Sequence, residues 1–195
     1  MLKSGITVRW LLTTILVIVL ILTAISATIV LVLKDYYYET AENKLQSLGQ
    51  SSVVADYFSS YLGSNDDSFS ARAKEYVDNF QELNVAELWV INKDGDIIVT
   101  STGFVSDDEE YPDYIDALDS VSGRAVWQGT MSSGEKVMAL SVLLPRTNGI
   151  SNGAVRYIIS LEAIDLQIAK ITIIVGVISL FALFAALCSS LVSLG

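Results

Sequence analysis

Histidine is absent from the 195 residues, which also contain only one cysteine and two prolines. Without histidine the chain has no phospho-accepting histidine, no histidine metal ligand and no triad with a histidine base. This excludes the usual acyl-transfer enzymes, and we expect no catalytic residue and no cofactor in this chain. Because Cys188 stands alone, disulfides cannot stabilise a folded domain, which must depend on packing.

Charged residues are missing from two long runs, Trp10–Leu33 and Ile171–Gly195. A helix rises about 1.5 Å per residue, so each run can cross a hydrocarbon core about 30 Å thick. A cleaved signal peptide is the alternative for the first run. However, its apolar part is longer than usual, and Lys34 and Asp35 replace the small residues of a cleavage site. The sequence therefore predicts two membrane spans, residues 10–33 and 171–195, in contact with membrane lipid.

All acidic residues lie between the two runs. The segment Asp35–Lys170 contains all 22 Asp and Glu residues against nine Lys and Arg, which leaves a net charge of −13. Lys3 and Arg9 precede the first run, so the positive-inside rule places residues 1–9 in the cytoplasm and residues 34–170 outside the cell. We therefore expect a two-pass protein of the cell membrane. The acidic domain disfavours nucleic-acid binding.

Helical periodicity continues beyond the first run. Apolar and small residues recur at steps of three or four: Tyr37, Ala41, Leu45, Leu48, Ser52 and Ala55. No proline or glycine interrupts this pattern before Gly49, so the membrane helix is expected to continue outward as one rod. The stripe has two interpretations, the apolar face of a helix that serves its own core or a dimer seam like a short coiled coil. The second interpretation predicts a homodimer.

The period changes in the stretch ELWVINKDGDIIVTS, Glu87–Ser101. Two β-rich runs flank an Asp-Gly pair, which is a strong hairpin signal because glycine accepts a positive φ. A helix over Phe69–Leu83 precedes the hairpin and a short helix around Tyr114–Leu118 follows it. Three more strands are expected, at Arg124–Gln128, Lys136–Leu144 and Ala154–Leu161. The prediction is an α+β, PAS-like fold with a five-stranded antiparallel sheet and a long N-terminal helix, with helices on one face and loops on the other.

The last predicted strand leads directly into the second span. Leu161, Ile164, Ile168 and Ile171 are helically spaced. We expect a signal to move the helix that carries Leu45 and Leu48 relative to the helix that carries Ile164 and Ile168. The spans would repeat that movement inside the cell, with a coupling of about 1–3 kcal/mol.

Four motifs carry a resemblance to a known family. They are WVINKDGDIIVTSTGF, the GxxxW pattern at Gly123–Trp127, GEKVMALSVLLP at Gly134–Pro145 and GAVRYIISLEAID at Gly153–Asp165. Together they resemble the extracytoplasmic single Cache (PDC, PAS-like) domain of Gram-positive membrane sensor histidine kinases, and the resemblance includes both spans. It implies a sensory input region of a two-component sensor histidine kinase.

The family normally continues into HAMP, dimerisation and ATP-binding kinase domains. ATP and Mg would belong to that kinase domain, and a response regulator would be reached through it. No basic residue follows the second span, so we expect this sequence to be part of a longer protein. Two alternatives stay open: the input region of a chemoreceptor or cyclic-nucleotide enzyme, and a complete small membrane protein that binds a partner outside.

The resemblance also implies a ligand site between the sheet and the loop before the third strand. Its lining candidates are Tyr111, Tyr114, Arg124, Trp127, Met138, Ser141 and Tyr157. Arg124 is the expected partner of a carboxylate, because a guanidinium fork suits planar anions. The alternative makes Trp127 and Tyr157 core aromatics and Arg124 a solvated charge. Such a sensor can also lack a small-molecule pocket and respond to a protein.

Acidic residues cluster before the short helix. Asp107, Asp108, Glu109, Glu110 and Asp113 could supply carboxylate oxygens to a hard cation such as Ca²⁺. The spacing DDEEYPD lacks the alternation and the glycine of an EF-hand loop. A solvated acidic loop is therefore the favoured interpretation, and no metal site is expected.

Overall fold

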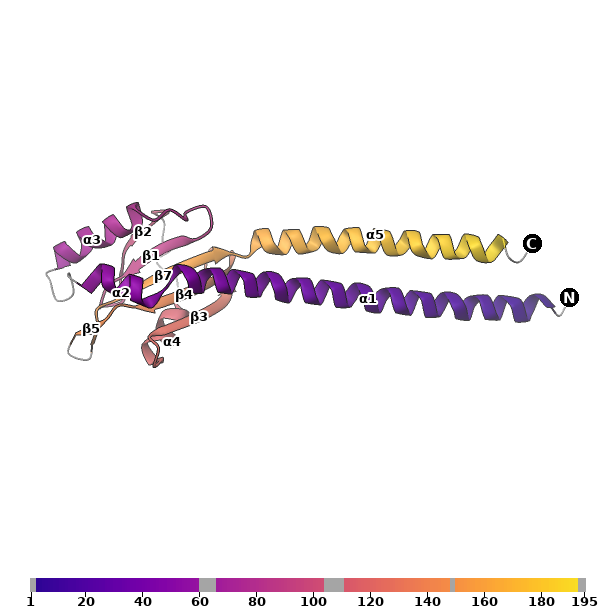
Figure 1. Cartoon of the computed structure of the whole chain (residues 1–195), viewed down its shortest axis with the longest axis horizontal. Coiled ribbons are helices and arrows are strands. Elements are labelled where there is room, and N and C mark those ends of the chain that lie inside the picture. Colours follow the sequence, from indigo (N-terminus) through magenta and orange to yellow (C-terminus); the bar gives the residue numbers. More distant parts are fainter. Residues whose placement is uncertain (1–2, 60–65, 104–110, 148–149, 193–195) are drawn as a thin grey trace. The chain divides into compact units, whose positions relative to one another are not determined.

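The computed structural model describes residues 3–59, 66–103, 111–147 and 150–192. It divides into two compact units, one formed by Met1–Tyr38 and Ile164–Gly195 and the other by Glu39–Ala163. Figure 1 labels the elements along the chain. The first unit contains the apolar helices, and the second contains the sheet.

Two long helices, α1 (Lys3–Leu48) and α5 (Glu162–Val192), carry the uncharged runs. Both are long and apolar enough to cross a membrane, and no residue of their most apolar windows is buried. The prediction that the first helix continues past its apolar run is confirmed as far as Leu48. The helix ends there, because glycine at position 49 is a weak helix former.

The second unit is built on an antiparallel sheet in the order β2-β1-β7-β4-β3. Its strands are β1 (Glu87–Ile91), β2 (Ile97–Thr100), β3 (Arg124–Thr130), β4 (Lys136–Leu143) and β7 (Ala154–Ser160). The predicted α+β fold with a five-stranded antiparallel sheet is therefore confirmed. A small ribbon of β5 (Arg146–Thr147) and β6 (Ile150–Ser151) was not expected from the sequence.

The predicted hairpin between β1 and β2 is also confirmed. Asn92 organises its turn, because its side-chain Oδ1 accepts hydrogen bonds from the main-chain N–H groups of Asp94, at 2.9 Å, and Asp96, at 2.8 Å. Gly95 adopts a φ of 91°, a value that glycine reaches without strain. The local sequence alone thus suffices to form this ribbon.

Helices α2 (Ser51–Ser59) and α3 (Asp66–Asp78) belong to one face of the sheet. On that face a Tyr76 hydroxyl from α3 lies 2.7 Å from the Tyr157 hydroxyl of β7. Helix α4 (Pro112–Asp119) instead packs on β3 and β4 from the other face, where Asp113 meets Ser141. The expectation that helices cover one face and only loops close the other was wrong, because α4 brings buried side chains of its own.

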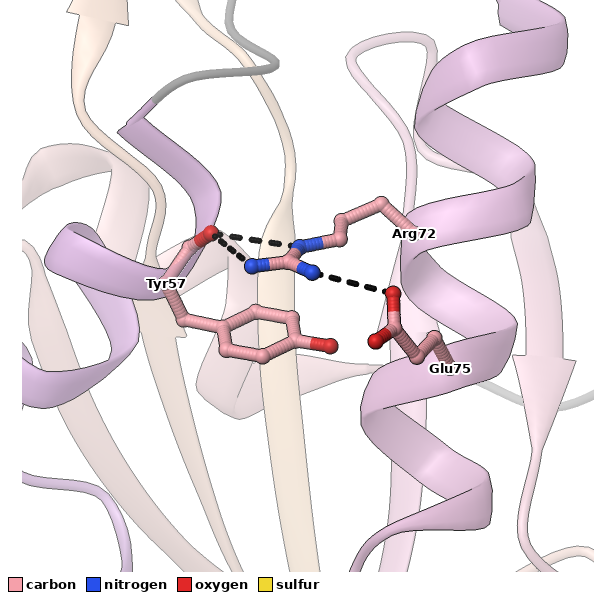
Figure 2. A network of polar contacts seen from close by, with 3 residues as sticks. All are labelled: Tyr57, Arg72 and Glu75. Atoms are coloured by element: carbon pink, nitrogen blue, oxygen red, sulfur yellow. Dashed lines mark hydrogen bonds and ion pairs between the residues drawn. The ribbon is translucent and has the colours of Figure 1, made fainter.

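Arg72 connects α3 to α2, as Figure 2 shows. Its guanidinium lies 3.6 Å from the centre of the Tyr57 ring and donates to the main-chain oxygen of Tyr57, from Nη2 at 3.2 Å. Nη1 donates to Glu75 at 2.9 Å. Because Tyr57 belongs to the last turn of α2, a cation there complements the negative end of the helix dipole. The contact fixes α2 against α3 at the edge of the domain.

Candidate functional site

Charged residues are buried at one place on the α4 face of the sheet. Asp113 and Arg156 are both 0% exposed, as is Ser141 beside them. Arg156 lies in the middle of the central strand β7, and in register with it lie Trp89 of β1 and Ser141 of β4. Because opposite residues of paired strands point to the same face, these three side chains form one row across the sheet.

Asp113 comes from the first turn of α4, which begins directly after Tyr111. Pro112 stands at the start of the helix, where its missing N–H costs nothing and its fixed φ favours the turn. An acid in this turn also complements the positive end of the helix dipole. The local sequence Tyr111-Pro112-Asp113 therefore starts the helix and places the carboxylate at its sheet-facing end.

Three polar groups contact the carboxylate of Asp113. The Nε–H of Arg156 donates to it, with distances of 2.9 Å to Oδ2 and 3.1 Å to Oδ1. The Arg156 Nη2 atom lies 2.9 Å from Oδ1. The Ser141 hydroxyl donates to Oδ2 at 2.6 Å. A buried ion pair needs such additional hydrogen bonds to offset the desolvation of its two charges.

Two aromatic rings lie beside the guanidinium of Arg156. The ring centre of Trp89 is 4.9 Å away and that of Tyr111 is 5.2 Å away. These rings meet each other edge to face, with centres 5.9 Å apart. The Trp89 indole N–H donates to Glu87 at 2.6 Å, which fixes its orientation. The arrangement is a cation held between aromatic faces, away from water.

The guanidinium of Arg156 keeps donors that no hydrogen bond uses. Among the described residues, neither Nη1 nor Nη2 has a hydrogen-bond partner, although Nη2 is within ion-pair distance of Asp113. The Nη2 atom is therefore close to the carboxylate but poorly aligned for a hydrogen bond, and the pair contributes electrostatic attraction. A guanidinium has five N–H donors, and Nε uses one of them here. The remaining donors suit a planar group with two oxygens, such as a carboxylate.

The predicted lining residues divide between the two faces of the sheet. Four belong to the α4 face: Tyr111, Tyr114, Trp127 and Ser141. Three belong to the opposite face: Arg124, Met138 and Tyr157. Alternation explains the division, because Arg124 lies opposite Val142 while Ser141 is opposite Ala125. That these residues contact a ligand stays a prediction.

Two of the residues on the opposite face, Arg124 and Tyr157, have partners within the domain. Nη2 of Arg124 donates to Gln46 of α1, at 2.6 Å to its side-chain oxygen and 3.3 Å to its main-chain oxygen. The Tyr157 hydroxyl pairs with that of Tyr76, and the ring of Phe80 packs on Tyr157. Burial raises the pKa of Tyr157 far above its ordinary value and also raises the pKa of Tyr76.

The sequence interpretation missed Arg156 and Trp89. A signal for Arg156 was present, because it is the one charged residue inside the apolar run AVRYIIS. A charge in the central strand of a sheet is almost never buried without a partner. Its partner, Asp113, was grouped with the acidic residues before α4, whereas the structure places it in the ion pair. Only the three-dimensional fold brings the two together.

The remaining predicted residues are the candidate metal ligands and the signalling residues. Asp107, Asp108, Glu109 and Glu110 lie outside the described residues. Within the described ranges, no group of three or more His, Cys, Asp or Glu residues could hold a metal ion. Of the signalling residues, Leu45 and Ile168 are buried, and Leu48 and Ile164 are half-buried.

No protein-family model matches the chain, and no curated protein matches it. Among solved structures it is similar to the ligand-binding domain of the amino acid chemoreceptor PctC of Pseudomonas aeruginosa PAO1, in complex with GABA. Identity is 16%, the match covers 67% of this chain and 62% of that one, and the TM-score is 0.40.

Two further structures are similar to this chain. The sensor domain of the V. cholerae histidine kinase DctB matches at 14% identity over 67% of this chain and 57% of that one, with a TM-score of 0.40. A Mycobacterium tuberculosis transcriptional regulator matches at 15% identity over 40% of this chain and 29% of that one, with a TM-score of 0.28. The chain thus spans less than two thirds of each of the three structures.

Proposed function

We propose that this chain is the sensory input and transmembrane signalling region of a membrane receptor. One observation carries the proposal: a folded α+β domain is inserted between two helices that are each long and apolar enough to span a membrane. Helix α1 continues without a break from its apolar run to Leu48, and only Leu161 separates β7 from α5. Because helices are stiff, a rearrangement at either junction is passed along the span.

The receptor is proposed to cross the membrane twice, with the N-terminus in the cytoplasm and the domain outside. Lys3 and Arg9 support this orientation. The test is labelling of Asp94→Cys, in the exposed β1–β2 turn, by a membrane-impermeant maleimide on intact cells in a Cys188→Ser background. We expect immediate labelling there, whereas Ser4→Cys, which keeps both Lys3 and Arg9, should react only after the cells are permeabilised. The reverse pattern would contradict the proposed orientation.

The ligand is proposed to be a small molecule with a carboxylate that binds Nη1 of Arg156, which has no hydrogen-bond partner among the described residues. Because Arg156 is 0% exposed, the proposal requires the half-buried Tyr111 to move aside when the ligand binds. The test is thermal unfolding of the full chain in detergent with a panel of amino acids and other small carboxylates. At least one should raise the unfolding temperature of the wild type and of Arg124→Lys, but not of Arg156→Lys. Both variants keep the positive charge and lose the guanidinium fork, so they form a matched pair. A ligand effect lost only in Arg124→Lys would assign the site to the other face.

The finer proposal is that the receptor is a two-component sensor histidine kinase that works as a homodimer. The motif resemblance supports it. The apolar stripe on α1 does not support a dimer seam, because its residues Ala41 and Leu45 are buried within the domain itself. Kinase domains following this region would bind ATP and Mg and transfer the signal to a response regulator. The coding sequence after Gly195 tests this directly, because a kinase requires a HAMP linker and then a helix that carries histidine. A chemoreceptor or cyclase domain there would contradict the kinase and leave the sensory role intact.

A further inference from the structure

Polar side chains join α1 to α5 at two heights within the first compact unit. Towards the domain-proximal ends of the helices, the Tyr38 hydroxyl donates to Asp165 at 2.7 Å, and the Gln167 amide donates to the Tyr37 hydroxyl at 3.2 Å. Within the uncharged runs, the hydroxyls of Ser26 and Ser179 lie 3.1 Å apart. These are contacts between two antiparallel helices that enter and leave the domain.

The serine contact differs from the other hydroxyl contacts of α1. Four threonine hydroxyls of this helix donate to the carbonyl four residues earlier in the same helix: Thr13, Thr14, Thr23 and Thr28. That arrangement satisfies a hydroxyl without a partner helix. Ser26 instead reaches across to Ser179, beside a cleft of about 310 Å³ that Gly176 and Thr23 also line. Small residues at this height let the two backbones approach closely.

The two contacts share one axial register. From Ser26 to Tyr38, α1 rises about 18 Å, and from Asp165 to Ser179, α5 rises about 21 Å in the opposite direction. Both contacts can therefore form together in only a narrow range of relative positions. A slide of about 3 Å, two residues' rise, would lengthen both beyond the hydrogen-bond limit if the side chains stayed in place. Serine has a single side-chain torsion, so the Ser26–Ser179 pair cannot follow such a slide.

The two contacts also lie in different surroundings. Ser26 and Ser179 lie in runs without charged residues, where no water competes for the hydroxyls if the runs span a membrane. Asp165, in contrast, belongs to the first turns of α5, and its Tyr38 partner packs against the Lys34 ammonium, 5.5 Å from the ring centre. One contact therefore resists a slide inside the apolar layer, and the other resists it at the outer boundary.

We infer that the Ser26–Ser179 and Tyr38–Asp165 contacts form a two-point register lock that holds the two spans in one signalling position. This inference rests on the proposed transmembrane signalling function. A stimulus that slides one span along the other must break both contacts. The shifted position of the spans is therefore reached only when neither hydrogen bond is formed. The lock thus sets the balance between the two positions.

The test measures the register directly, with the full chain in lipid vesicles and a Cys188→Ser background. Positions Val30 and Val175 lie between the two contacts and are both half-buried. A disulfide between Val30→Cys and Val175→Cys reports the locked register, and one between Val30→Cys and Ile171→Cys reports a register shifted by one turn. The quantity compared is the ratio of the two crosslinking rates under mild oxidation.

The double variant Ser26→Ala with Tyr38→Phe removes only two oxygen atoms. It should raise the shifted-to-locked ratio by at least about threefold, the factor that one average hydrogen bond between membrane helices provides. The matched control is Thr28→Ala, which removes a hydroxyl that donates within α1 to Ala24 and should leave the ratio unchanged. An unchanged ratio in the double variant, or an equal change in the control, overturns the lock.

The failure of the lock can be separated from failure of the proposed function. The crosslinking ratio is measured without any stimulus and does not depend on the orientation of the chain. If the ratio does not move while Asp94→Cys is labelled from outside, the lock is overturned and the receptor proposal stands. If the ratio moves but Asp94→Cys is labelled only from inside, the contacts do fix the register, and the receptor proposal is overturned together with the signalling role of the lock.

Discussion

The buried ion pair between Asp113 and Arg156 makes the domain sensitive to a single substitution. We predict that Asp113→Ala destabilises the protein by about 3–5 kcal/mol, the cost of removing one partner of a buried ion pair. The structure supports the upper part of this range. Both side chains are 0% exposed, so water cannot replace the lost carboxylate around Arg156.

The contacts show what the substitution leaves behind. Asp113 accepts hydrogen bonds from Arg156 Nε at 2.9 Å and from Ser141 at 2.6 Å. After Asp113→Ala, the guanidinium loses its anionic partner among the described residues and keeps its contacts with the faces of Trp89 and Tyr111. Both cation–π contacts are already present with Asp113 in place, so they do not compensate for the loss of its carboxylate. The pair therefore dominates the energetics of this face.

The assay is urea unfolding of the full chain in detergent, followed by tryptophan fluorescence. Trp89 reports the change because it packs on the pair. Asp116→Ala is the matched control, since Asp116 lies on the same helix and is exposed, and it should stay within about 0.5 kcal/mol of the wild type. Ser141→Ala removes one hydrogen bond to a charged group and should cost about 1.5–3 kcal/mol.

A double substitution separates loss of the pair from loss of packing. Asp113→Leu with Arg156→Met removes both charges and fills the space with apolar atoms, so it should recover most of the stability lost in Asp113→Ala. A cost for Asp113→Ala no larger than that of Asp116→Ala would refute the reasoning, because it would mean that the charge of Arg156 is solvated. A double variant as unstable as Asp113→Ala would show that shape, and not charge, determines the cost.

Two further predictions concern the sheet. Gly153→Ala should destabilise the protein by more than Gly134→Ala in the same unfolding assay, because both have a positive φ but only an added Cβ at Gly153 meets the Ile91 carbonyl oxygen, at 2.1 Å. Equal losses of stability in the two variants would show that the backbone at Gly153 moves away from the Ile91 carbonyl oxygen at little cost. Stability should fall as the pH rises above about 10, by about 1.4 kcal/mol per pH unit for each buried phenol. Burial raises the pKa of Tyr76 and Tyr157, so the unfolded chain releases protons that the folded chain retains, and Tyr157→Phe should flatten the fall.

Local patterns in the sequence were sufficient for most of the architecture. The two uncharged runs predict long apolar helices because the length of a span follows from composition alone. Asp-Gly between β-rich runs predicts the β1–β2 hairpin because turn geometry is set within a few residues. The other three strands of the main sheet, β3, β4 and β7, were predicted within two residues of their observed ends. Helix α4 was predicted because its apolar residues follow a helical period, whereas the small ribbon of β5 and β6 was missed.

The tertiary structure decided which side chains meet. Arg156 and Asp113 are 43 residues apart, and no local pattern states that the helix carrying Asp113 packs on the face of the sheet to which Arg156 points. The face on which each lining candidate lies depends on strand register, since a shift of one residue moves every side chain to the other side. Likewise, the contacts of Tyr38 with Asp165 and of Ser26 with Ser179 join helices more than a hundred residues apart. Composition and period are properties of short segments, whereas ion pairs and helix register depend on packing between distant ones.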